Sequence, residues 1–117
     1  MPWVNVVTTR SLAEADLQKL NAGITAALVE HAGKQAPGVY VSFSRPETFF
    51  WGQEKRDDAA IFEVRWIGEF SLEVKRQITR RFSTELAPAV GLDPDRVRVL
   101  FSTFSSEDWG RSRGEYS

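Results

Sequence analysis

The chain has 117 residues, 42% of them hydrophobic, which provides one packed core and is too short for two. It has no cysteine, which excludes disulfides, thiolate catalysis and thiolate metal sites, and it has a single histidine, His31. Fifteen basic and sixteen acidic side chains give a net charge of −1, which argues against a nucleic-acid partner, and no apolar run is long enough for a membrane span.

The first third of the chain predicts a strand, a helix and a second strand. The first strand covers Trp3 to Thr8, and a helix opens on Ser11, where Glu14 completes the spacing of a capping box. Apolar residues of this helix recur every three or four positions and form one stripe: Leu17, Leu20, Ile24 and Leu28. Gly33 is the residue type that closes a helix in the left-handed conformation, and a strand follows over Val39 to Ser44.

The middle of the chain, Pro46 to Asp58, contains three adjacent aromatics, Phe49, Phe50 and Trp51. With the charged residues 54–58 after them, they predict a short edge strand and its turn. Neighbouring side chains of a strand point to opposite faces, so the three rings cannot all face the core. We expect at least one of them to be covered by another subunit.

The second half repeats the first. A strand over Ala59 to Ile67 leads into a helix that opens on Ser71 and carries the stripe Val74, Ile78, Phe82 and Leu86. The basic residues of this helix fit its solvated side better than a phosphate site: Lys75, Arg76, Arg80 and Arg81. Pro88 is expected to end or kink the helix.

Both halves continue in the same way after a glycine. Val39, Val41, Phe43 and Ser44 follow Gly33 at the distances at which Val97, Val99, Phe101 and Ser102 follow Gly91. The prediction is an α+β fold in which duplicated β-α-β units form a four-stranded mixed sheet with two helices on one face. We expect a single domain, residues 1–117, with a pseudo-repeat of 1–45 and 59–104 and a tail at 105–117. RNA-recognition modules share this layout, but neither long strand carries their base-stacking pattern.

Pro2 is the residue with the greatest chemical potential. If Met1 is removed, the chain begins with a rigid secondary amine, and an ordinary α-amino group titrates at about 7.7 to 8.0. Burial or a nearby cation lowers that pKa, which leaves a neutral base able to remove a proton next to a carbonyl. A proline that merely leads into a strand is the structural alternative.

Several short motifs give the chain a family resemblance over nearly its whole length. They are Met-Pro-Trp-Val-Asn-Val at residues 1–6, Ala-Gly-Lys at 32–34, Ile-Gly at 67–68, Gly-Leu-Asp-Pro-Asp-Arg-Val at 91–97 and Trp-Gly at 109–110. In this order and spacing the chain resembles the tautomerase superfamily, and within it the macrophage migration inhibitory factor and D-dopachrome tautomerase branch.

The resemblance implies a homotrimer whose three sheets form a barrel, with an active site at each subunit interface. Pro2 would be the general base that moves a proton between the α-carbon and the oxygen of a small carboxylate substrate such as phenylpyruvate. Lys34 would bind the substrate carboxylate and lower the pKa of the proline, and the backbone of Ile67 would line the pocket. A solvated lysine at a helix end is the structural alternative for Lys34.

The chain departs from the mammalian members at three site positions. Arg98 and Leu100 replace a tyrosine and an asparagine on the last long strand, and Arg111 replaces an aromatic residue, although Tyr116 keeps an aromatic in the tail. Arginine binds carboxylates at two points, so a pocket with Lys34, Arg98 and Arg111 is expected to favour doubly anionic substrates. The cysteine pair linked to redox activity in the mammalian protein is absent.

The sequence leaves two other functions open. Superfamily branches that pair the proline with two arginines decarboxylate or hydrate three-carbon acids, and a non-catalytic signalling trimer would also tolerate the lost residues. Arg10, just after the first strand, is a further candidate for the site. No cofactor, metal, nucleic acid or membrane partner is expected, and the expected compartment is the cytoplasm.

Overall fold

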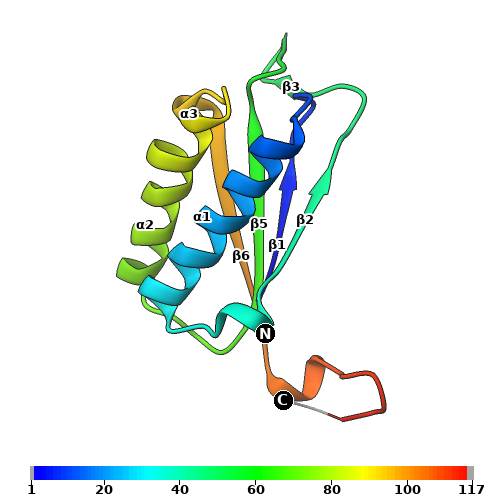
Figure 1. Cartoon of the computed structure of the whole chain (residues 1–117), viewed down its shortest axis with the longest axis vertical. Helices are drawn as coiled ribbons and strands as arrows, with labels where there is room; N and C mark the ends of the chain where they lie inside the picture. Colours follow the sequence, from blue (N-terminus) through cyan, green and yellow to red (C-terminus); the bar gives the residue numbers. More distant parts are fainter. Residues whose placement is uncertain (1, 116–117) are drawn as a thin grey trace.

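The computed structural model describes residues 2–115 and contains two helical segments packed on one face of a four-stranded sheet (Figure 1). The strand order is β2-β1-β5-β6. The sheet strands are β1 (Trp3–Val7), β2 (Tyr40–Ser44), β5 (Ala60–Ile67) and β6 (Val97–Phe104). The main helices are α1 (Glu14–Ala32) and α2 (Leu72–Arg80). The predicted α+β class, the mixed sheet and the one-sided helical layer are confirmed.

The two β-α-β units are related by an approximate two-fold axis between the central strands. β1 pairs in parallel with β2, β5 pairs in parallel with β6, and β1 and β5 are antiparallel. Trp3 lies opposite Tyr40, and Ile61 lies opposite Arg98; the shift that aligns Gly33 with Gly91 aligns these pairs as well. The halves therefore point in opposite directions. We call the edge where β1 and β2 begin the Pro2 end, and the edge where β5 and β6 begin the Arg98 end.

The core lies between the sheet and the helices. Along β5, alternate residues are buried: Ala60, Phe62, Val64 and Trp66. The predicted stripe of the first helix supplies Leu20, Ile24 and Leu28 to the same core, and the second helix supplies Ile78 and Phe82. The rings of Phe62 and Phe82 lie 4.9 Å apart between their centroids. The opposite face of the sheet has no helix over it (Figure 1).

The predicted capping box at the first helix is wrong. α1 begins at Glu14, with Ala13 as its N-cap and no side-chain hydrogen bond to the first turn. Leu12 packs against the core, and Ala13 is extended with ψ of 161°, so the chain turns into the helix two residues after Ser11. The end of the helix is as predicted, because Gly33 adopts the left-handed conformation with φ of 65°.

The second helix is longer than α2 alone. Ser71 caps it through a 3.2 Å hydrogen bond from the Val74 amide. A π-helical turn, η2 (Arg81–Leu86), and a last short turn, α3 (Ala87–Ala89), continue it to the residue after Pro88. Arg81 leaves the solvated side and forms ion pairs with Glu85 in its own helix and, at 2.6 Å, with Glu30 in α1.

The aromatic segment forms a hairpin of its own. β3 (Phe50–Trp51) pairs with β4 (Glu54–Lys55), so the predicted short strand is present and belongs to a two-stranded sheet separate from the main one. Residues 54–55, expected in the turn, form the second strand. Phe50 is 61% exposed, whereas the guanidinium groups of Arg96 and Arg98 lie over the ring of Trp51. The hairpin projects at the Arg98 end (Figure 1).

Two features are absent from residues 2–115. No helix there combines the length and the apolar character needed to cross a membrane. No three histidine or acidic side chains in this range come together as metal ligands.

Candidate active site

Pro2 is held in place by the backbone of the neighbouring strand. The Tyr40 amide donates a 2.9 Å hydrogen bond to the Pro2 carbonyl, and this bond extends the β1–β2 ladder by one residue. The Pro2 side chain is fully buried. Since Trp3 pairs with Arg65, the register places Pro2 next to Trp66 on the helix-covered side of the sheet. Pro2 is therefore rigidly positioned at the start of the central strand.

Lys34 reaches the same end of the sheet from the helical layer. It directly follows Gly33, whose left-handed conformation turns the chain out of α1. Its ammonium donates a 3.1 Å hydrogen bond to the Ile67 carbonyl at the end of β5. The nitrogen lies 4.7 Å from the ring centroid of Phe70 and 5.6 Å from that of Trp66. Two of the predicted site residues, Lys34 and Ile67, are thus in contact, beside the segment that begins at Pro2.

The environment of Lys34 is electrostatically unusual. The half-buried ammonium is held by a carbonyl and two aromatic faces, and burial lowers the pKa of Lys34 below its ordinary value of 10.5. Among residues 2–115, no carboxylate forms an ion pair with it. A partly dehydrated cation without a counter-ion binds an anion more strongly than an exposed, paired one does.

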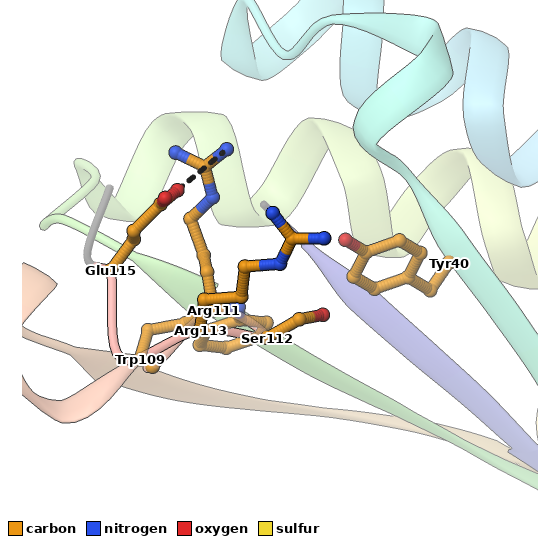
Figure 2. Close-up of a pocket in the computed structure, with 7 residues that line it drawn as sticks. Tyr40, Trp109, Arg111, Ser112, Arg113 and Glu115 are labelled. Atoms are coloured by element: carbon orange, nitrogen blue, oxygen red, sulfur yellow. Dashed lines mark ion pairs between the residues drawn. The ribbon is translucent and has the colours of Figure 1, made fainter.

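The C-terminal tail forms a pocket of about 460 Å³ at the Pro2 end. Its walls are Tyr40 from β2 and residues 109–113 and 115 of the tail, which hooks beneath the sheet (Figures 1 and 2). Trp109 anchors the tail by packing edge-on against Phe104, with ring centroids 5.5 Å apart. Arg111 forms a loose ion pair with Glu115, at 3.8 Å between nitrogen and oxygen. The structure therefore places Arg111 in a pocket that borders the Pro2 segment through Tyr40.

A second pocket, of about 430 Å³, lies next to the Lys34 contact. It is lined by residues 67–69 after β5 and residues 103–106 at the end of β6. Ile67, whose carbonyl accepts the hydrogen bond from Lys34, is part of its wall. The Pro2 end of the sheet thus has two pockets, one lined by the tail and one lined by the ends of β5 and β6.

Arg98 lies at the opposite edge of the protomer. It occupies the second position of β6, points away from the helices and stacks over Trp51 of the hairpin, with 4.4 Å from its guanidinium carbon to the ring centroid. Arg96 approaches the same ring at 5.6 Å. One protomer therefore does not bring Arg98 to Pro2. The predicted role of Arg98 in substrate binding requires a neighbouring subunit.

Two further candidates are placed differently. The guanidinium of Arg10 packs closely over Gly91 at the Arg98 end, far along β1 from Pro2. Tyr116, predicted to keep the tail aromatic, lies outside the described residues.

The open face of the sheet carries a chain of hydrogen bonds next to Pro2. Trp3 donates to Ser42 at 2.8 Å, Ser42 donates to the Asn5 side chain at 2.8 Å, and Asn5 donates to Glu63 at 3.0 Å. Glu63 also accepts a 2.9 Å bond from Arg65, whose guanidinium stacks over Trp3 at 4.6 Å. These contacts fix the side chains that follow Pro2 on the open face.

Sequence reasoning missed Tyr40 and Arg113 as residues of the tail pocket. Strand alternation was sufficient to find Tyr40, because it shares the open face with Ser42 just as Arg98 shares it with Leu100. No periodic signal marks Arg113, which lies in an irregular tail.

Comparison with known proteins supports this fold. No family model matches the sequence, and no curated protein shows significant sequence similarity to it. Among solved structures, the macrophage migration inhibitory factor of Toxoplasma gondii aligns with a TM-score of 0.84 at 16% identity, covering 98% of this chain and 99% of that one. Leishmania major MIF2 aligns with a TM-score of 0.84 at 21% identity, covering 100% and 97% of the two chains.

Solved structures of enzymes are also similar in fold to this chain. A malonate semialdehyde decarboxylase, described with decarboxylase and hydratase activities, aligns with a TM-score of 0.78 at 22% identity, covering 97% of this chain and 92% of that one. A fused 4-OT described as a symmetric trimer aligns with a TM-score of 0.83 at 19% identity, with 97% and 94% coverage. The chain has the tautomerase-superfamily fold, as the sequence resemblance implied.

Proposed function

We propose that this protein is a cofactor-independent keto-enol tautomerase that acts on a small 2-oxo carboxylic acid, with Pro2 as its general base. The carrying observation is the half-buried Lys34 ammonium, free of a described carboxylate partner and 3.1 Å from the Ile67 carbonyl, at the end of the sheet where Pro2 is anchored. A solved structure with a similar fold is described as inactivated by 2-oxo-3-pentynoate, a small 2-oxo carboxylic acid, which is consistent with this assignment.

The proposed chemistry needs the amine of Pro2 and one cation. Once Met1 is removed, the nitrogen lone pair of Pro2 takes a proton from the carbon next to the keto group. The C–H electron pair forms the carbon–carbon double bond of the enol, and the carbonyl π electrons move to oxygen. The same proton, or one from water, then completes the enol. Lys34 binds the substrate carboxylate and stabilises the negative charge that develops beside it.

The assembly is part of the proposal. The open sheet face and the distant Arg98 fit a homotrimer in which a neighbouring subunit completes each site, and a fused 4-OT with this fold is described as a symmetric trimer. Native mass spectrometry is expected to give three times the protomer mass. A monomer at micromolar concentration would remove Arg98 from the site.

The test of the base starts with the intact mass, which is expected to lack Met1. Exchange of the C3 protons of phenylpyruvate in D2O, followed by NMR, is expected to fall by about 100-fold or more in Pro2→Ala. Pro46→Ala, a proline at the other end of the sheet, is the matched control and is expected to retain activity. A retained Met1, or equal exchange in wild type and Pro2→Ala, would contradict the proposal.

A decarboxylase or hydratase is the second candidate, because a malonate semialdehyde decarboxylase has the same fold at 22% identity and the tail adds cations to the site. Release of carbon dioxide from a 3-oxo acid, faster than proton exchange in a 2-oxo acid, would favour this reaction. A trimer that shows neither activity would favour a non-catalytic binding role.

A further inference from the structure

We infer that the pocket of the C-terminal tail is a subsite for a second carboxylate, so that the preferred substrates are 2-oxo dicarboxylates whose distal carboxylate binds Arg113 and Arg111. This inference rests on the proposed function of the Pro2 site and names its substrate class. Three observations carry it: the position of the pocket, its charge and the weak internal ion pair that it contains.

The first observation is position. Tyr40 lines the tail pocket with its side chain and anchors Pro2 with its backbone amide, at 2.9 Å from the Pro2 carbonyl. The pocket therefore lies at the end of the sheet where Pro2 is anchored, and Tyr40 is common to the pocket and to the anchoring hydrogen bond. Its volume of about 460 Å³ falls within the range of roughly 300–1,000 Å³ that small-molecule sites occupy.

The second observation is that the guanidinium of Arg113 has no ion pair within residues 2–115. Figure 2 shows the guanidinium of Arg113 extending toward the phenol of Tyr40, while that of Arg111 extends toward Glu115. Arg113 forms no hydrogen bond or ion pair with any residue in the range 2–115. Among the described residues that line the pocket, two arginines stand against one glutamate, so their side chains together carry a net positive charge. Guanidinium donors match the two oxygens of a carboxylate.

The third observation is that Glu115 is a weak internal competitor. The Arg111–Glu115 separation of 3.8 Å is too long for a hydrogen bond, and the two side chains are 50% and 63% exposed. Exposed ion pairs of this kind contribute little to stability. A substrate carboxylate can therefore take the place of the Glu115 side chain on Arg111 while Arg113 binds its second oxygen.

The kinetic test compares 2-oxoglutarate with 2-oxopentanoate, which has the same chain length and lacks the distal carboxylate. We expect the wild type to show a lower KM for 2-oxoglutarate. Arg113→Gln is expected to raise that KM by about tenfold or more, with kcat and the 2-oxopentanoate KM nearly unchanged. Glu115→Gln is expected to lower the 2-oxoglutarate KM a few-fold, because it removes the competitor. Arg76→Gln, an exposed arginine on α2, is the matched control.

A binding test separates this inference from the proposed function. Glutarate, which has no keto group, and pentanoate are titrated into the full-length wild type, Arg113→Gln and Pro2→Ala, with NMR detection. The inference predicts that glutarate binds more tightly than pentanoate, that Arg113→Gln loses this preference and that Pro2→Ala keeps it. Equal binding of the two acids, or a glutarate preference that survives both Arg113→Gln and Arg111→Gln, would overturn it. Absence of C3 proton exchange in the wild type, with the glutarate preference intact, would contradict the proposed function and leave the carboxylate subsite standing.

Discussion

The two ends of the sheet share one backbone frame and differ in a few side chains. At the Pro2 end, Gly33 ends the helix in the left-handed conformation and Lys34 follows. At the Arg98 end, Gly91 does the same, but the next residue is Leu92, which is buried in the core. The backbone is duplicated at the two ends, but the lysine that follows the glycine at the Pro2 end is replaced by a leucine at the Arg98 end.

The strands show the same contrast. The alignment of the two halves pairs Pro2 with Ala60, a buried residue without a functional group, and Tyr40 with Arg98. Tyr40 borders the tail pocket, whereas Arg98 is stacked over Trp51 of the hairpin. The difference teaches that the fold supplies two equivalent positions and that the sequence places the residues of the proposed proton-transfer site at one of them. The other end serves as an internal control.

The largest expected effect comes from making the Pro2 end like its counterpart. Lys34→Leu copies Leu92, and it removes a charged hydrogen-bond donor worth about 1.5–3 kcal/mol. We expect KM for phenylpyruvate to rise by about 10–100-fold with a smaller change in kcat, measured by steady-state kinetics. Lys55→Leu, an exposed lysine in the hairpin, is the control and is expected to leave KM unchanged. An unaltered KM in Lys34→Leu would show that Lys34 does not distinguish the Pro2 end from the Arg98 end in substrate binding.

The second prediction uses pH. Burial lowers the pKa of Lys34 below 10.5, so the folded protein loses this proton before the unfolded chain does. In the window between the lowered pKa and 10.5 the unfolded chain binds more protons, and the free energy of unfolding from this group rises with pH. Carboxylate binding falls in the same window, because the ammonium is neutralised.

We therefore expect KM for a 2-oxo acid to rise with pH in that window in the wild type. In Lys34→Arg the rise is expected to disappear, because a guanidinium keeps its charge. A pH profile of KM from neutral to alkaline conditions checks this. The same rise in both proteins would assign it to another group.

The third prediction compares the two helix-ending glycines. A Cβ at Gly33 meets open space, whereas a Cβ at Gly91 would lie 2.6 Å from Nη2 of Arg10. Both glycines have positive φ, so Gly33→Ala is expected to lower the free energy of unfolding by about 1 kcal/mol. Gly91→Ala is expected to cost about 2 kcal/mol in urea titrations, because Arg10 must also move. In an Arg10→Ala background, the two alanine substitutions are expected to cost more nearly the same free energy of unfolding. Equal losses for Gly33→Ala and Gly91→Ala in the chain that keeps Arg10 would refute the explanation.

The smallest expected effect is at the hairpin. Arg98→Gln removes a cation–π contact and is expected to lower the free energy of unfolding by about 0.5–1 kcal/mol. Arg76→Gln, exposed on α2, is expected to have no effect. A rise in the substrate KM in Arg98→Gln would show that this arginine serves the site of a neighbouring subunit. No stability change would mean that the stacking on Trp51 contributes nothing.

The fold was largely predictable because its signals are periodic. The matching Val-x-Val-x-Phe-Ser strands after Gly33 and Gly91 gave the two β-α-β units, and the apolar stripes gave both helices. The start of α1 was not predictable from cap spacing. The packing of Leu12 against the core, a tertiary contact, keeps the chain extended past Ser11.

The site was predictable in part. Lys34 and Ile67 are in contact, and both were identified through short local motifs, Ala-Gly-Lys at 32–34 and Ile-Gly at 67–68. The tail pocket was not predictable, since Arg113 and Tyr40 lie far apart in sequence and line one pocket only in the folded chain, where Trp109 packs on Phe104. Nor does any sequence rule place Arg98 over Trp51, because the hairpin is a separate two-stranded sheet whose position against β6 is a tertiary contact.

The hydrogen bond that anchors Pro2 has a consequence for how new specificities arise. Its donor is the main-chain amide of residue 40, which every amino acid except proline provides. The side chain at that position can change while the proposed base stays in place, so substrate preference and catalytic power are separable at this point of the chain. A library at position 40 that excludes proline is expected to vary the substrate preference while keeping the hydrogen bond that anchors Pro2.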